Sequence, residues 1–195
     1  MNKPLILFVG KSSSGKTTIA NMLETQYGYK QVESYTTRAP RYDGERGHTF
    51  VSEEEFKNLG ELAAYTFYDG NHYGTTFNQL NECDIYVIDV PGVESLLNKL
   101  KDDTRPVAIF YFDASVHNRI LRMKERGDSD HAVIHRLLQD EEYDWQSKLE
   151  SITWIQANVE NKYVEIFRVD ANREQSDVLE YVLYYIRKFN GDYYE

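Results

Sequence analysis

The chain of 195 residues is 41% hydrophobic and carries a net charge of −10, because 32 acidic side chains outnumber 22 basic ones. The hydrophobic fraction is enough for one packed domain and excludes intrinsic disorder as the default. The acidic excess argues against a protein that coats nucleic acid, since binding to phosphate backbones needs a surplus of Lys and Arg.

Short apolar runs alternate with longer amphipathic stretches, which is the pattern of a parallel sheet flanked by helices. The first run, residues 5–9, is apolar throughout, as expected of a strand covered on both faces. The further strands of this sheet are expected at residues 29–32, 84–89, 106–112 and 163–169.

Helices are expected wherever apolar residues recur at a spacing of three or four. The first follows a glycine-bounded loop and ends at Gly28, and later ones follow a turn at Pro91-Gly92, span residues 115–126 before Gly127, or begin at Ser129. The apolar face of the first helix consists of Ile19, Ala20, Leu23 and Tyr27, and that of the helix after Pro91-Gly92 consists of Val93, Leu96, Leu97 and Leu100. The helix that begins at Ser129 has Ile134, Leu137, Leu138 and Trp145 on one face. A final helix near the end of the chain has the apolar residues Val178, Leu179, Val182, Leu183 and Ile186 on one face.

Residues 34–80 differ from the rest of the chain, because turn residues and charges are dense and the β-like pieces, such as residues 62–68, are short. A short helix at 52–59 begins with Ser52 and Glu55, which have the spacing of a capping box. We interpret this stretch as an insertion that carries a binding surface.

Residues 10–17 match G-x-x-x-x-G-K-[ST] at every fixed position. Gly10 and Gly15 allow a tight turn whose N–H groups point at one phosphate, and Lys16 supplies a mobile positive charge. The Thr17 hydroxyl can hold Mg²⁺, and the helix that begins here directs its positive dipole end to the same place. Because a buried strand enters the loop and an amphipathic helix leaves it, we expect a nucleoside triphosphate, ATP, as the first ligand.

Arg38 and Arg41 lie three residues apart, and Arg41 follows a proline. Two guanidinium groups at this spacing can converge on one anion, because their N–H forks match phosphate oxygens in pairs. The alternative is two solvated loop arginines.

The phosphate loop and four later segments, in this order, resemble the guanylate kinase family. The segments are S-x-T-T-R-x-P-R at 34–41, G-N-x-Y-G-T at 70–75, I-D-x-x-G at 88–92 and R-x-x-x-R-G at 122–127, which Arg136 follows. The resemblance implies an α/β fold with a three-layer P-loop NTPase-type parallel sheet in a single domain. It also implies a core of residues 1–33 and 81–195, a monophosphate-binding subdomain at about 34–80 and a helical lid at about 126–140.

The resemblance further implies a role for each matching residue. The donor phosphates would be held by Gly10, Ser12, Ser13, Ser14, Gly15, Lys16, Thr17 and Thr18, with Arg122, Arg126 and Arg136 closing over them. The acceptor phosphate would be held by Arg38, Arg41 and Tyr73, and the acceptor base by Ser34, Thr75 and Asp89. Lys16, Arg38, Arg126 and Arg136 would be catalytic, because phosphoryl transfer depends on positioning and charge neutralisation.

Two positions depart from the family pattern. His48 stands where the family usually has a tyrosine that touches the acceptor phosphate, and a histidine can still donate a hydrogen bond there. Ala64 stands where the family has a glutamate that accepts hydrogen bonds from guanine, and alanine cannot accept one. Glu61 or Tyr65 could replace it if the loop shifts; otherwise guanine is not the preferred base.

Other polar clusters have simpler interpretations. His131 and His135 are expected to be a surface pair, because no third metal ligand accompanies them. The acidic run at residues 140–142 is expected to be a solvated helix face. Cys83, the only cysteine, cannot form an internal disulfide and is expected to be inert packing.

We therefore expect a kinase that uses ATP and Mg²⁺ to phosphorylate GMP or dGMP. The alternatives are a monophosphate kinase with a different base preference, and a non-catalytic interaction module of the same fold. No apolar run approaches the roughly 20 residues that a membrane span needs, so we expect a cytoplasmic protein that binds nucleotides, neither nucleic acid nor membranes, as a monomer or homodimer.

Overall fold

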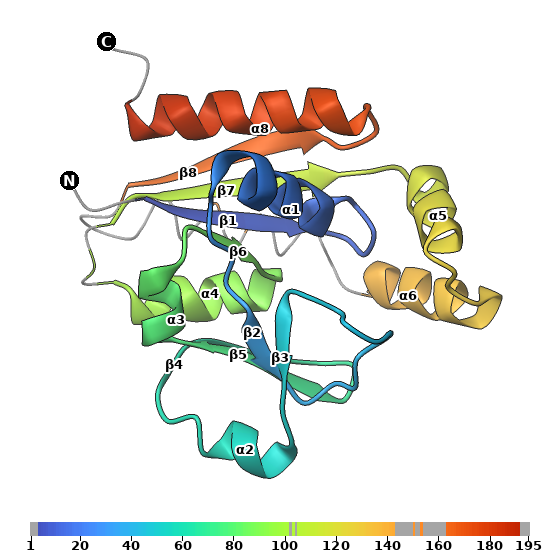
Figure 1. Cartoon of the computed structure of the whole chain (residues 1–195), viewed down its shortest axis with the longest axis horizontal. Coiled ribbons are helices and arrows are strands. Elements are labelled where there is room, and N and C mark those ends of the chain that lie inside the picture. The colour runs from blue at the N-terminus through green and yellow to red at the C-terminus, as the bar shows by residue number, and fades with distance from the viewer. Residues whose placement is uncertain are drawn as a thin grey trace.

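A computed structural model describes residues 4–101, 103, 105–142, 150, 153 and 163–191. Its main sheet is parallel throughout, with the order β6-β1-β7-β8. The strands are β1 (Leu5–Gly10), β6 (Ile85–Val87), β7 (Val107–Asp113) and β8 (Val164–Asp170). Helices cover both faces of this sheet, which confirms the predicted three-layer α/β fold (Figure 1).

The alternation of side chains along β1 produces the two buried layers. Leu5, Leu7 and Val9 pack on one face with α3 (Phe77–Glu82) and α4 (Val90–Lys99). Ile6 and Phe8 pack on the other face with α1 (Lys16–Tyr27) and α8 (Gln175–Asn190). The predicted apolar stripe of α8 is buried along its whole length.

A second, smaller sheet lies beyond α4 and has the order β3-β2-β5-β4 (Figure 1). Its strands are β2 (Ser34–Thr36), β3 (His48–Phe50), β4 (Leu62–Tyr68) and β5 (Asn71–Thr76). The short helix α2 (Glu53–Lys57) begins at Ser52 with the predicted capping box, in which Ser52 and Glu55 satisfy each other's backbone N–H groups.

Two helices lie beyond the carboxyl ends of the strands of the main sheet, and the second of them is next to the smaller sheet (Figure 1). They are α5 (Val116–Glu125), which Ser115 caps, and α6 (Asp130–Glu142). The apolar face predicted for α6 is wrong for the described residues, because Ile134 and Leu138 are 58% and 54% exposed. Trp145, assigned to the same face, lies outside the described residues.

Three further local predictions are wrong. Residues 29–32 form no strand; Gln31 makes only an isolated bridge to Ile85. Pro91-Gly92 is no turn, because Asp89 caps α4 and the proline lies in its first turn, where a missing N–H costs nothing. Tyr27 is 44% exposed at the end of α1, just before Gly28 stops the helix in a left-handed conformation.

Among the described residues, no helix has both the length and the apolar character needed to cross a membrane.

Candidate active site

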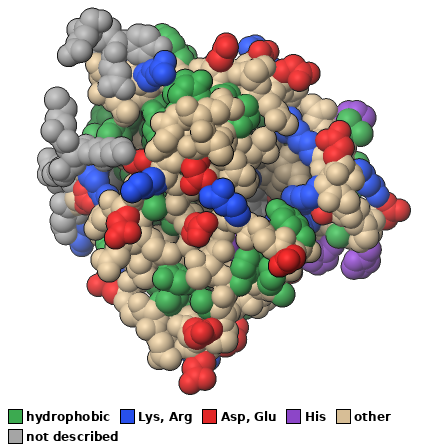
Figure 2. All heavy atoms as spheres, in the orientation of Figure 1, with side chains coloured by type: hydrophobic (Ala, Val, Ile, Leu, Met, Phe, Trp, Pro, Cys, Tyr) green, Lys and Arg blue, Asp and Glu red, His purple; other side chains and the backbone are tan. Residues whose placement is uncertain are grey.

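A cavity of about 490 Å³ opens where the carboxyl ends of the main strands face the second sheet. Residues 12–19 line one end of it, and Ser34, Arg41, His48 and Tyr73 from the second sheet and its loops line the other. Arg122, Arg126 and Arg136 line it from α5, from the residue that ends α5, and from α6. In Figure 2, Lys and Arg side chains lie around a hollow in this face.

The loop between β1 and α1 has backbone conformations that favour glycine. Gly15 has φ +102, and Gly10 has φ +150 with room for no side chain, because a Cβ there would lie 2.5 Å from the Phe112 carbonyl oxygen. The Ser13 hydroxyl oxygen is buried on the cavity wall and has no hydrogen-bond partner among the described residues. A buried hydroxyl without a partner, in a glycine-bounded loop at the start of a helix, fits an anionic ligand.

The ammonium group of Lys16 lies inside this loop. It donates to the carbonyl oxygens of Gly10 at 2.7 Å and Lys11 at 2.9 Å. Burial lowers the pKa of Lys16 to about 8, although Asp140 and Asp89 act in the opposite direction. The fold therefore holds a cation in a place where its charge is disfavoured, which is typical of a functional lysine.

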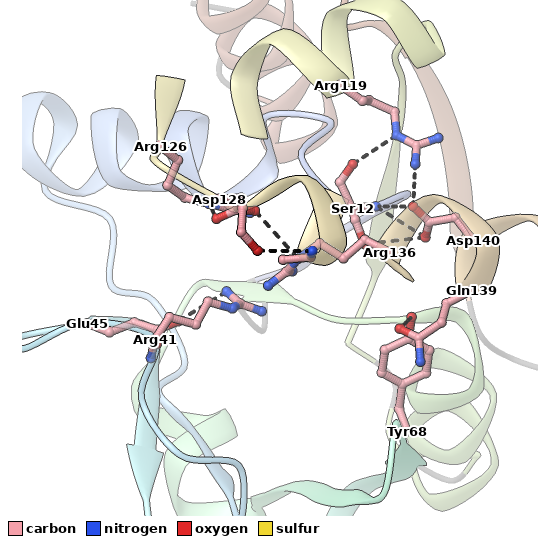
Figure 3. A network of polar contacts seen from close by, with 12 residues as sticks. Ser12, Arg41, Glu45, Tyr68, Arg119, Arg126, Asp128, Arg136, Gln139 and Asp140 are labelled. Atoms are coloured by element: carbon pink, nitrogen blue, oxygen red, sulfur yellow. Dashed lines mark hydrogen bonds and ion pairs between the residues drawn. The ribbon is translucent and has the colours of Figure 1, made fainter. Parts of the chain in front are cut away.

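A buried ion pair flanks the same loop and was missed by the sequence analysis. The guanidinium of Arg119, on α5, pairs with the carboxylate of Asp140, on α6, and donates to the Ser12 carbonyl oxygen at 2.9 Å. The N–H of Ser12 donates to Asp140 Oδ2 at 3.2 Å (Figure 3). Asp140 is 5% exposed, so the prediction that this acidic run is a solvated face is wrong at its first residue.

The three arginines that the sequence analysis expected near the donor phosphates, Arg122, Arg126 and Arg136, differ in their contacts. Arg122 donates to the carbonyl oxygens of Ser14 at 3.1 Å and Ala171 at 2.6 Å, so it joins the loop to the end of β8. Arg126 and Arg136 both approach Asp128, with Nε–O distances of 3.1 and 3.6 Å (Figure 3). The hydrogen bond from Arg126 lowers the pKa of Asp128 below its usual range.

Arg38 and Arg41 converge on one anion, the carboxylate of Glu45 from the same loop. Arg38 Nη2 and Arg41 Nη1 donate to Glu45 Oε1 at 2.9 and 3.1 Å. Burial acts to raise the pKa of Glu45, but the hydrogen bonds and charges of the two arginines outweigh burial and hold the pKa below its usual value, so the carboxylate is ionised. Burial is the largest cause that lowers the pKa of Arg41, to about 10, and the nearby charges of Arg38 and Arg136 act in the same direction.

Ser34 and His48 face each other in paired strands, with Ser34 Oγ 2.9 Å from His48 Nδ1. Burial and Arg38 lower the pKa of His48 to about 4, so this imidazole is neutral at pH 7. The His48 ring lies edge-on to Tyr73 at 5.7 Å between centroids. A neutral imidazole adds no charge to the arginine pair but keeps a ring nitrogen for a hydrogen bond.

Asp89 caps the N-terminus of α4, two residues after β6 ends, and lines the cavity. Burial raises its pKa, although its Oδ1 accepts hydrogen bonds from Thr66 and from the Gly92 N–H, both at 2.8 Å. Thr75 and Arg38 lie outside the set of residues that lines the cavity; Thr75 is fully buried and donates to Gln79.

Ala64 lines the cavity and is buried, so the structure brings no acid to this part of the wall through residue 64. Glu61 is exposed and pairs with Lys99. Tyr65 is also exposed, and its hydroxyl lies 2.8 Å from His72 Nδ1. Because side chains alternate along β4, Ala64 and Thr66 share the cavity face.

Several lining residues had no signal in the sequence, among them Thr66, Tyr68 and Tyr86. His131 and His135 are exposed, as predicted, and stack on each other. Cys83 is half-buried, where burial raises the pKa of its thiol.

Comparison with known proteins adds independent findings. The family model "Guanylate kinase" matches residues 1–167. The guanylate kinase of Lactobacillus acidophilus is 30% identical over 190 residues, covering 85% of this chain and 92% of its own length, and that of Streptococcus thermophilus is 32% identical over 148 residues, covering 68% and 69%. The crystal structure of guanylate kinase from Anaplasma phagocytophilum shares the fold, with a TM-score of 0.55, 22% identity, and coverage of 96% of this chain and 86% of that chain.

Proposed function

Because the chain belongs to the guanylate kinase family, we propose that it transfers the γ-phosphate of ATP to the phosphate of GMP or dGMP. The observation that carries the proposal is a cavity with the phosphate loop at one end and, at the other, Arg41, whose guanidinium converges with that of Arg38 on Glu45. Such a cavity can hold two phosphorylated ligands end to end.

The donor phosphates are assigned to the loop of residues 10–18, most of which lines the cavity and which contains Lys16 and the buried Ser13 hydroxyl. Lys16 neutralises charge on the group in transfer, and Arg126 and Arg136 approach it from the residue that ends α5 and from α6. No protein base is required, because the attacking oxygen of a monophosphate is already anionic.

Mg²⁺ is assigned to the hydroxyl of Thr17, which is exposed in the first turn of α1 and lines the cavity. No group of three His, Cys, Asp or Glu side chains in the described part of the chain could hold a metal ion on its own. The ion would therefore bind together with the nucleotide's phosphate oxygens, where it neutralises their charge.

The acceptor phosphate is assigned to Arg38, Arg41, His48 and Tyr73, and the acceptor base to Ser34 and Asp89 on the cavity wall and to Thr75, which is buried. The arginine pair already binds a carboxylate, that of Glu45, which supports its use for a second oxyanion. We further propose that residues 34–80 form the monophosphate-binding unit and residues 126–140 the lid.

A panel of monophosphates with MgATP in an ADP-release assay tests the function. We expect turnover with GMP and dGMP to exceed that with AMP, CMP, UMP and dTMP. Because residue 64 is an alanine and supplies no acid to the cavity wall, a kinase with another base preference is the second candidate, and a higher kcat/KM for a non-guanine acceptor would establish it. No turnover with any acceptor would favour a non-catalytic module.

Replacing Arg41 by alanine is expected to raise the KM for the acceptor by roughly 10- to 30-fold and to leave the KM for ATP within about twofold, because one charged hydrogen-bond partner of the acceptor phosphate is lost. Steady-state kinetics with each substrate varied in turn measures both constants. Arg46→Ala is the matched control, because Arg46 lies in the same loop but is exposed and pairs with Glu24. A rise in the KM for ATP alone would contradict the assignment.

A further inference from the structure

The buried pair Arg119–Asp140 connects three parts of the site that are distant in sequence. Arg119 comes from α5, Asp140 from the last turn of α6, and both contact Ser12 in the phosphate loop. The pair holds both backbone polar groups of Ser12, because Asp140 accepts from the Ser12 N–H and Arg119 donates to the Ser12 carbonyl oxygen (Figure 3). The Ser12 hydroxyl is a further donor to Asp140, at 3.4 Å.

These contacts fix the backbone of the phosphate loop from outside. Arg119 and Asp140 are 2% and 5% exposed, so solvent hardly competes for their hydrogen bonds. A buried ion pair contributes little net stability compared with apolar side chains of the same volume. Its presence beside a phosphate loop therefore favours a role in geometry over a role in stability.

Helix α6 also carries Arg136, which lies one helical turn before Asp140 and on the same face. Gln139 accepts a hydrogen bond from the Tyr68 hydroxyl at 3.2 Å, which joins this turn to β4 of the second sheet. Whatever holds Asp140 against the loop therefore also sets the distance between Arg136 and Lys16.

We propose that Arg119 and Asp140 are positioning residues, which lock α6 to Ser12 and thereby place Arg136 opposite the phosphate loop. The proposal rests on the proposed phosphoryl transfer for the role of Arg136, but not for the clamp on Ser12 itself. Arg119 lies behind the residues that line the cavity and Asp140 lines it beside Ser12; the role proposed for both is exerted through the backbone of Ser12 and through α6.

The first test is the kinetics of Asp140→Ala, for which kcat should fall roughly tenfold or more, since small displacements of positioned groups are costly in rate. Glu141→Ala is the matched control, because Glu141 is the exposed neighbour on the same helix, and it should leave kcat unchanged. In an Arg136→Ala background, Asp140→Ala should lower kcat by no more than about threefold, because a positioning residue has little left to position. Equal losses with and without Arg136 would overturn the proposal.

Loss of folding is separated from loss of positioning by the double variant Arg119→Met with Asp140→Leu. Apolar replacement of a buried ion pair usually preserves stability, so its melting temperature should stay close to that of the parent. Its kcat should nevertheless remain as low as that of Asp140→Ala, because Ser12 has lost both partners. A double variant with the parent's kcat would show that the pair serves only stability.

Hydrogen exchange distinguishes failure of this proposal from failure of the proposed function. The Ser12 amide should exchange faster in Asp140→Ala than in the parent, even without nucleotide. If the parent shows no kinase activity, the proposed function fails and the exchange result alone decides the clamp. If the parent is active and Ser12 exchange is unchanged, the clamp fails and the function stands.

Discussion

Lys16→Ala is expected to lower kcat by roughly 10³-fold, because a preorganised charge at the group in transfer is lost. Lys16 donates to two carbonyl oxygens of its own loop, and burial lowers its pKa to about 8. The fold thus bears the cost of desolvating an ammonium that contributes little to packing. A group held in this way is retained for its chemistry, and its removal should not unfold the protein.

The measurement is single-turnover formation of the diphosphate, together with the melting temperature. Lys99→Ala is the control, because Lys99 is exposed and pairs with Glu61 far from the loop, and its kcat should equal that of the parent. If Lys16→Ala formed the diphosphate as fast as the parent, the assignment of the donor phosphates to this loop would be refuted. A large fall in melting temperature would instead show that Lys16 is structural.

The parts of the fold that the sequence predicts well are those fixed by neighbours along the chain. β1, the loop and α1 follow from an apolar run, two glycines and a helical stripe, and the residues involved span fewer than 30 positions. α8 and the capping box of α2 are local in the same sense. For these elements the pattern of side chains and the final burial agree.

The clamp on Ser12 shows why the rest of the site could not be predicted. Asp140 begins a run of three acidic residues, and such a run is normally solvated. Its burial is caused by Arg119, 21 residues away, and by Ser12, 128 residues away. No local pattern marks either contact, so only the packing of α5 and α6 against the loop reveals it.

The arginine pair is an intermediate case. The spacing of Arg38 and Arg41 predicts convergence on an anion, and they converge on Glu45. The low pKa of His48, however, depends on burial and on Arg38, neither of which the sequence shows. Charge and hydrogen-bond donors can be predicted from residue types, whereas protonation depends on the finished fold.

Ala64→Glu is expected to raise the ratio of kcat/KM for GMP over IMP by roughly 100-fold, because a hydrogen bond to a charged group contributes about 1.5–3 kcal/mol. IMP lacks the exocyclic amino group of GMP, so the ratio isolates the bond that a carboxylate at residue 64 would accept. In the parent chain neither Glu61, which pairs with Lys99, nor Tyr65, which lies near His72, supplies such an acceptor. The parent should therefore discriminate GMP from IMP by less than about tenfold.

Ala64→Gln is the matched control, since it has the size of glutamate without the charge and should raise the ratio by a smaller factor. The gain in Ala64→Glu requires an ionised carboxylate, and burial raises the pKa of such a group. The ratio should therefore be highest at alkaline pH and decline as the pH falls through that pKa. A parent that already prefers GMP over IMP by more than about 100-fold would mean that the cavity accepts the amino group elsewhere, with Asp89 as the nearest candidate on the same wall.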